Sequence, residues 1–172
     1  MRSIGIRWLG HALALFIAWG GLVGVGHGGQ ERPLAPDFEL VTSTGEVVSN
    51  ITLRGRPVLL VFWAPWCNVC RKELPEIANF YRQDKPEQLR VISIGFADFR
   101  NTVETFVRER PAVFVFPTAY DEDRWVAQAF KVRATPTYVV LDHQGQIAMT
   151  HLGAGLLQNA QFQALLAKLK KL

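Results

Sequence analysis

A run of six apolar residues, 58–63, lies just before the paired cysteines Cys67 and Cys70. Its length and its content of valine, leucine and aromatic residues predict a buried strand. In the segment that follows, apolar residues recur at helical spacing, at Cys70, Leu74, Ile77 and Tyr81. The sequence therefore predicts a strand that leads directly into a helix, with Cys67 at the helix start and Cys70 on the buried face.

This placement predicts different chemistry for the two thiols. Free backbone N–H groups and the positive end of the helix dipole surround a residue at a helix start, and they favour the thiolate form of Cys67. Cys70 is shielded one turn further on, but it is close enough to form a disulfide with Cys67. We interpret the pair as a redox-active dithiol, with Cys67 as the attacking thiol and Cys70 as the resolving thiol.

Three other uses of a Cys-x-x-Cys pair fit the sequence less well than redox chemistry. A structural disulfide across two intervening residues closes a very short loop and stabilises little, because the entropic gain grows with loop length. A zinc site needs more ligands, but the chain has only two cysteines and no His-x-x-x-His pair. Haem attachment needs histidine directly after the second cysteine, where the chain has Arg71. We predict no metal site and no bound cofactor.

Residues 1–29 are predicted to be a targeting segment. Arg2 and Arg7 precede an uncharged, largely apolar stretch, 8–26, and positive residues on that side keep the N-terminus in the cytoplasm. At about 19 residues the stretch is near the minimum for crossing a bilayer. We favour an uncleaved signal anchor over a cleaved signal peptide. Either one predicts an extracytoplasmic domain at the periplasmic face of the inner membrane, where disulfides persist.

The net charge does not indicate a nucleic-acid partner. The formal charge is +4, but without Arg2 and Arg7 there remain 17 basic and 15 acidic residues. The one basic cluster, 168–171, ends a predicted helix, where cations complement the helix dipole.

A linker, 30–36, leads into one predicted domain, 37–172. Within the domain we expect a hairpin over 38–48, strands at 58–63, 91–96, 138–141 and 147–150, and a closing helix over about 157–172. A helix after residue 100 is expected to be capped by Asn101, with Glu104 as its capping-box partner. The acidic residues 121–123 are expected to begin a short helix in solvent. This order predicts an α/β fold with a mixed central sheet covered by helices on both faces.

The sequence Phe-Trp-Ala-Pro-Trp-Cys-Asn-Val-Cys at 62–70 resembles the active site of the thioredoxin fold. The same resemblance includes Pro75 and the downstream Thr135-Pro136-Thr137. Ala-Pro-Asp-Phe at 35–38, Glu73 and an insert between residues 91 and 135 narrow it to the TlpA/ResA/CcmG branch of extracytoplasmic thiol–disulfide oxidoreductases. In that branch a hairpin extends the thioredoxin fold at its N-terminus, and the insert lies in its centre.

The resemblance implies roles for residues beyond the cysteines. The Thr135–Pro136 bond is expected to be cis and to face the disulfide, with the Thr135 backbone offering hydrogen bonds to an extended substrate segment. Trp66 is expected to be a partly exposed contact surface for substrate, whereas Trp63 is expected in the core.

A departure from thioredoxin itself concerns the proton acceptor for Cys70. Thioredoxin has a buried aspartate six residues before its first cysteine, and here that position is Val61. Glu73 lies one turn beyond Cys70 and is our candidate acceptor. The alternative is that Glu73 is a solvated helix residue paired with a nearby base.

Together these features predict thiol–disulfide exchange on exported proteins, most simply as a reductant. The resemblance implies a membrane thiol electron donor, and clients such as apocytochrome c or a copper-site assembly protein. A copper-site assembly chaperone and a disulfide-forming oxidase are the alternatives. The chaperone would need three residues between its cysteines and a partnering histidine. The oxidase would need a larger helical insertion than the segment 91–135 provides.

Overall fold

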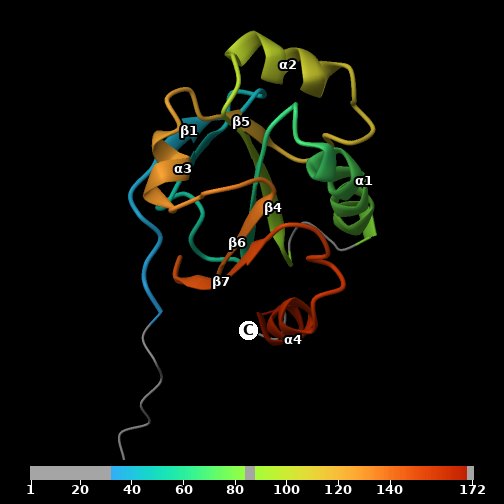
Figure 1. Cartoon of the computed structure of the whole chain (residues 1–172). Coiled ribbons are helices and arrows are strands. Elements are labelled where there is room, and N and C mark those ends of the chain that lie inside the picture. The colour runs from blue at the N-terminus through green and yellow to red at the C-terminus, as the bar shows by residue number, and fades with distance from the viewer. Residues whose placement is uncertain (1–31, 84–87, 170–172) are drawn as a thin grey trace, which may run out of the picture. The chain divides into compact units, whose positions relative to one another are not determined.

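The computed structural model describes residues 32–83 and 88–169, which form one compact unit (Figure 1). The predicted targeting segment, 1–29, lies outside these residues, as does the beginning of the predicted linker. Within the described residues, no helix is both long enough and apolar enough to cross a bilayer.

Five strands form the central sheet in the order β5-β4-β3-β6-β7. They are β3 (Val58–Trp63), β4 (Arg90–Gly95), β5 (Thr118–Tyr120), β6 (Thr137–Leu141) and β7 (Ile147–Leu152). The central strand β3 runs parallel to β4 and antiparallel to β6, so the sheet is mixed, as predicted. Every residue of β3 is buried, because both faces of the sheet are covered, and this explains its uninterrupted apolar sequence.

Helices pack on both faces of the sheet (Figure 1). The helices are α1 (Asn68–Gln83), α2 (Arg100–Arg108), α3 (Trp125–Ala129) and α4 (Ala160–Leu169). Leu59, Val61 and Trp63 of β3 share one core cluster with residues of α1, α2 and α4. The alternate residues Leu60 and Phe62 share a second cluster with α3 and with the hairpin of β1 (Glu39–Val41) and β2 (Val47–Ser49). The predicted thioredoxin-like architecture, including the N-terminal hairpin, is confirmed.

The predicted cap of α2 was wrong. The helix begins at Arg100, so Asn101 lies inside its first turn, and Phe99 occupies the N-cap position without a side-chain capping bond. Glu104 lies 3.7 Å from the guanidinium of Arg100 instead of closing a capping box. The reason is tertiary: the loop before α2 is held by side chains from elsewhere in the fold, and this sets the helix start.

The prediction of a solvated acidic helix start was wrong for Asp121. Its side chain is fully buried, and its carboxylate accepts hydrogen bonds from the N–H groups of Val126 (3.2 Å) and Ala127 (2.8 Å). Glu122 and Asp123 are exposed, as predicted. Asp121 therefore caps α3 from within the core, a role that its acidic neighbours obscure in the sequence.

Candidate active site

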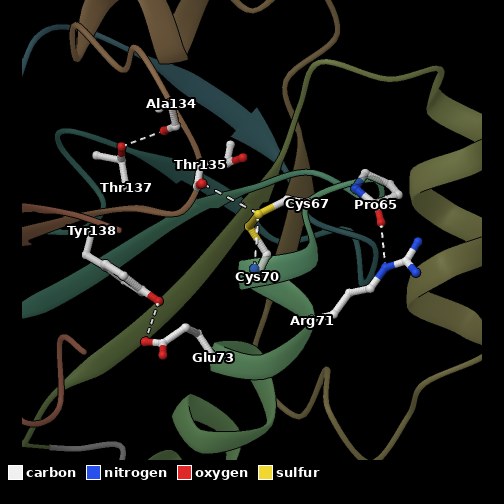
Figure 2. Close-up of a disulfide and its surroundings, with 9 residues drawn as sticks. All are labelled: Pro65, Cys67, Cys70, Arg71, Glu73, Ala134, Thr135, Thr137 and Tyr138. Carbon is white, nitrogen blue, oxygen red and sulfur yellow. Dashed lines mark hydrogen bonds between the residues drawn. A yellow bond between two sulfur atoms is a disulfide. The ribbon is translucent and has the colours of Figure 1, made fainter. Parts of the chain in front are cut away.

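The cysteines form a disulfide at the start of α1, close to the end of β3 (Figure 2). The two Cα atoms are 5.2 Å apart. Cys67 directly precedes the first residue of the helix, and Cys70 lies one turn inside it, as predicted. Cys67 is 5% exposed and Cys70 is 1% exposed, so Cys67 is the more accessible of two buried residues.

The backbone around Cys67 is arranged to favour a negative charge on its sulfur. The N–H of Cys70 donates a hydrogen bond of 3.0 Å to the Sγ of Cys67. In the reduced protein this N–H, together with the positive end of the dipole of α1, would stabilise the Cys67 thiolate. The geometry therefore agrees with Cys67 being the more acidic of the two thiols.

The loop before β6 lies against the disulfide. The Thr135–Pro136 bond is cis, as the resemblance predicted. The carbonyl oxygen of Thr135 lies 3.5 Å from the Sγ of Cys67 (Figure 2). Pro136 is buried and Thr135 is half-buried. The carbonyl of Pro136 accepts a 2.9 Å hydrogen bond from the N–H of Gly153, which ties this loop to the segment after β7.

Glu73 is buried on the same side of α1 as Cys70. Its Oε2 atom accepts a hydrogen bond of 3.4 Å from the hydroxyl of Tyr138 (Figure 2). The same oxygen accepts a 2.9 Å hydrogen bond from the N–H of Gly155. None of the ion pairs among the described residues includes Glu73. The alternative of a solvated glutamate paired with a base is therefore wrong.

The buried position of Tyr138 beside Glu73 changes the pKa of its hydroxyl. Burial raises the pKa of the Tyr138 hydroxyl, and the neighbouring negative charge of Glu73 raises it further. Tyr138 therefore remains a neutral hydrogen-bond donor to the carboxylate at physiological pH. Glu73 consequently connects α1 with β6 and with the segment that supports Pro136.

Trp66 is 58% exposed beside the disulfide, whereas Trp63 is fully buried, and both observations agree with the predictions. The indole N–H of Trp66 donates a 2.9 Å hydrogen bond to the carbonyl of Ala97. The ring is therefore held in one orientation while its face stays in contact with solvent.

Sequence reasoning missed Arg71 as a support of the active-site turn. Its Nε donates a 3.0 Å hydrogen bond to the carbonyl of Pro65 (Figure 2), and its guanidinium lies 5.6 Å from the centre of the Phe106 ring. The only available signal was its position directly after Cys70. The partners of Glu73, Tyr138 and Gly155, gave no local signal, because they follow it by more than 60 residues.

The model of the AhpC/TSA family matches residues 33–150, which are more than half of the chain. The chain belongs to the AhpC/TSA family. The thioredoxin-like fold and the disulfide at the start of α1 agree with this membership.

Individual relatives define the similarity more narrowly. The chain is 29% identical to the thiol-disulfide oxidoreductase ResA of Bacillus subtilis, over 69% of this chain and 65% of ResA. It is 34% identical to the thioredoxin-like protein YneN of the same organism, over 72% of each protein. A crystal structure of a candidate thiol:disulfide interchange protein DsbE from Chlorobium tepidum superposes with a TM-score of 0.71 at 28% identity, covering 81% of this chain and 97% of that one.

These similarities confirm the predicted resemblance to the TlpA/ResA/CcmG branch. The match spans just under two thirds of the length of the Bacillus subtilis ResA. Among the described residues, no group of three or more His, Cys, Asp or Glu side chains is arranged to hold a metal ion.

Proposed function

We propose that this member of the AhpC/TSA family is a thiol:disulfide oxidoreductase that reduces disulfides of exported proteins. One observation carries the proposal: the Cys67–Cys70 disulfide lies at the start of α1, with the Sγ of Cys67 against the backbone of Thr135. A thiolate stabilised at a helix start, next to a loop whose backbone can pair with an extended chain, is suited to disulfide exchange.

The proposed reaction transfers two electrons to the client. The Cys67 thiolate attacks one sulfur of a client disulfide, forms a mixed disulfide and releases the first client thiolate. Cys70 then loses its proton to Glu73, attacks the Sγ of Cys67 and releases the second client thiolate. The client disulfide is thereby reduced to two thiols, while the enzyme ends with the Cys67–Cys70 disulfide.

Substrate binding is assigned to three residues in this proposal. The backbone of Thr135 pairs with the client segment, Pro136 holds that backbone against the disulfide, and the exposed face of Trp66 contacts the client. The short separation of the Cys67 sulfur from Thr135 supports the first two roles, and the exposure of Trp66 supports the third.

The N-terminal sequence and the relatives support a proposed compartment and proposed partners. Residues 1–29 would direct the domain across the inner membrane, as an anchor or as a cleaved signal, so the reaction would take place in the periplasm. A membrane thiol protein would reduce the enzyme after each turnover. Apocytochrome c, in cytochrome c maturation, and copper-site assembly proteins are the proposed clients.

The reduction potential of the Cys67–Cys70 pair tests the direction of the reaction. Equilibration of the full-length protein with glutathione or dithiothreitol buffers should give a value well below about −200 mV, as expected for a reductant. A value near about −120 mV would instead identify a disulfide-forming oxidase. If the reduced protein failed to exchange with any disulfide but bound copper, the metal-chaperone alternative would replace the proposal.

A further inference from the structure

A cavity of about 880 Å³ lies beside Trp66, the residue before the attacking cysteine. Its aromatic lining is made of Trp66, Phe99 and Tyr120, and we call it the Trp66–Phe99 groove. Trp66 is 58% exposed and Phe99 is 79% exposed, so two large apolar rings meet solvent here. Because Trp66 directly precedes Cys67 in the chain, this groove is a candidate surface for the part of a client that flanks its disulfide.

The groove is held in shape by side chains from three parts of the fold. The indole N–H of Trp66 donates to the carbonyl of Ala97, and the hydroxyl of Tyr120 donates to the carbonyl of Asp98, both at 2.9 Å. The guanidinium of Arg100 lies 4.6 Å from the centre of the Tyr120 ring. Because the indole N–H is already bonded, the exposed part of Trp66 offers a ring face for apolar contact.

Phe99 occupies a position that the local structure does not favour. It is the N-cap residue of α2, where Ser, Thr, Asp or Asn would satisfy a free N–H of the helix, and its ring makes no capping bond. Its exposure also forgoes the stabilisation that burial of an aromatic ring would give. Positions where a chain departs from such local preferences are expected at functional sites.

The charges that line the groove favour a basic over an acidic ligand. The groove lining includes the carboxylates of Asp98, Glu104 and Glu122 and the guanidiniums of Arg100 and Arg124. Arg100 is already bound to Glu122 at 2.6 Å and lies 3.7 Å from Glu104. The lining therefore carries a net charge of −1, which repels an acidic side chain more than a basic one.

We propose that the Trp66–Phe99 groove binds the client segment that flanks the client disulfide, and that it selects a large apolar side chain next to a basic residue. This inference rests on the proposed exchange reaction at Cys67. The inference adds Phe99 as a specificity-determining residue. Phe99 belongs neither to the cysteine motif nor to the Thr135–Pro136 loop.

The test uses three peptides, each with one cysteine joined by a disulfide to 2-mercaptoethanol. Next to the cysteine the peptides carry Phe-Lys, Ala-Lys or Phe-Glu. The reduced full-length protein is mixed with each one, and the release of thiol gives a second-order rate constant. Each constant is divided by the rate of the same peptide with dithiothreitol, so that the intrinsic reactivity of the disulfide cancels.

We expect the Phe-Lys peptide to react about tenfold faster than the Ala-Lys peptide, because the aromatic ring of the peptide is transferred from water into the groove. It should react about threefold faster than the Phe-Glu peptide, as expected for a partly exposed charge contact. Phe99→Ala should remove most of the Phe-over-Ala preference. Ile51→Ala, which truncates a similarly exposed apolar residue outside the groove lining, should retain this preference.

Three results would overturn this inference. These are equal normalised rates for the three peptides, a preference for Phe-Glu over Phe-Lys, and an unchanged preference in Phe99→Ala. Dimerisation in sedimentation experiments that Phe99→Ala abolishes would instead assign the groove to a second copy of the chain. Bis(2-hydroxyethyl) disulfide, which carries no peptide, separates the two proposals. If it reacts while the peptides are not discriminated, only the groove proposal fails, and if no disulfide reacts, the exchange function fails as well.

Discussion

The backbone N–H of Cys70 points at the Sγ of Cys67 and donates to it at 3.0 Å, so one cysteine supplies the donor that stabilises the other as a thiolate. The reverse relation does not exist, because the N–H of Cys67 donates instead to the carbonyl of Ala64 at 3.1 Å. Cys70 lies inside α1 and is only 1% exposed. Apolar burial raises the pKa of a thiol, whereas a helix start lowers it. The fold therefore separates the reactivities of two thiols that the sequence places only three positions apart.

This asymmetry predicts which variant traps a client. Cys70→Ser should accumulate mixed disulfides through Cys67, because no thiol remains to resolve them, whereas Cys67→Ser should trap none. Non-reducing electrophoresis followed by mass spectrometry of the linked peptides measures both. Faster alkylation of Cys70 than of Cys67 in the reduced protein at neutral pH would contradict the assignment.

The buried cap of α3 predicts a stability effect far from the disulfide. Asp121→Ala should lower the free energy of unfolding by about 1–2 kcal/mol at pH 7, because it leaves the N–H groups of Val126 and Ala127 without their acceptor. Urea denaturation measures the change. Asp123→Ala, which truncates an exposed carboxylate two residues away, should change stability by less than about 0.5 kcal/mol.

The same residue predicts a pH dependence with a definite sign. Burial raises the pKa of Asp121, although the N–H bonds that it accepts oppose the shift. The Asp121 carboxyl therefore binds its proton more tightly in the folded state than in the unfolded state. As a result, the contribution of Asp121 to the free energy of unfolding falls as pH rises above about 4. The stability of the wild type relative to Asp121→Ala should be larger at pH 3.5 than at pH 7. A difference that grows with pH would contradict this.

The packing around Gly95 of β4, against Trp63 and Val103, leaves no room for a side chain. A Cβ atom at this position would lie 2.5 Å from Cγ1 of Val103 and 3.2 Å from Cζ2 of Trp63. Gly95→Ala should therefore destabilise the protein by about 1–3 kcal/mol through overpacking. Val103→Ala removes the closest atom, so the double variant should lose less stability than the sum of the single variants. Additive losses in urea denaturation would place the strain elsewhere.

Local patterns in the sequence were sufficient for the elements that build the site. The apolar run 58–63 and the spacing after Cys67 predicted β3, α1 and the different positions of the two cysteines. The resemblance correctly predicted the cis bond before Pro136, because Thr-Pro downstream of Cys-x-x-Cys is a specific pattern. These features depend on residues that are neighbours in the chain or members of one motif.

Features that depend on contacts across the fold could not be predicted. Asn101 had the sequence context of a helix cap, but Trp66 and Tyr120 hold the loop before α2, and the helix begins two residues earlier than that cap would place it. Asp121 looked like part of a solvated acidic start, and its burial is set by the packing of α3 on the sheet. The same limit applies to Glu73, whose donors Tyr138 and Gly155 come from segments distant in the sequence.

Glu73 gives the last prediction, because its two roles in the structure can be separated. Its Oε2 accepts the N–H of Gly155 and the hydroxyl of Tyr138, which supports the segment behind Pro136. As a carboxylate it can also accept the proton that Cys70 must lose. Glutamine keeps an oxygen that can accept these hydrogen bonds but cannot take up a proton at neutral pH, whereas alanine removes both functions.

We expect Glu73→Gln to fold normally and to slow resolution of the mixed disulfide by about 10- to 100-fold. This is toward the lower end of the rate losses that removal of one general base causes in enzymes. The pH profile of thiol reactivity should shift in the same variant. Glu76→Gln, one turn further along α1 at an exposed carboxylate, is the matched control and should change neither quantity. If Glu73→Gln resolves mixed disulfides at the wild-type rate with unchanged thiol pKa values while Glu73→Ala loses stability, Glu73 only supports the loop, and Cys70 passes its proton to another acceptor.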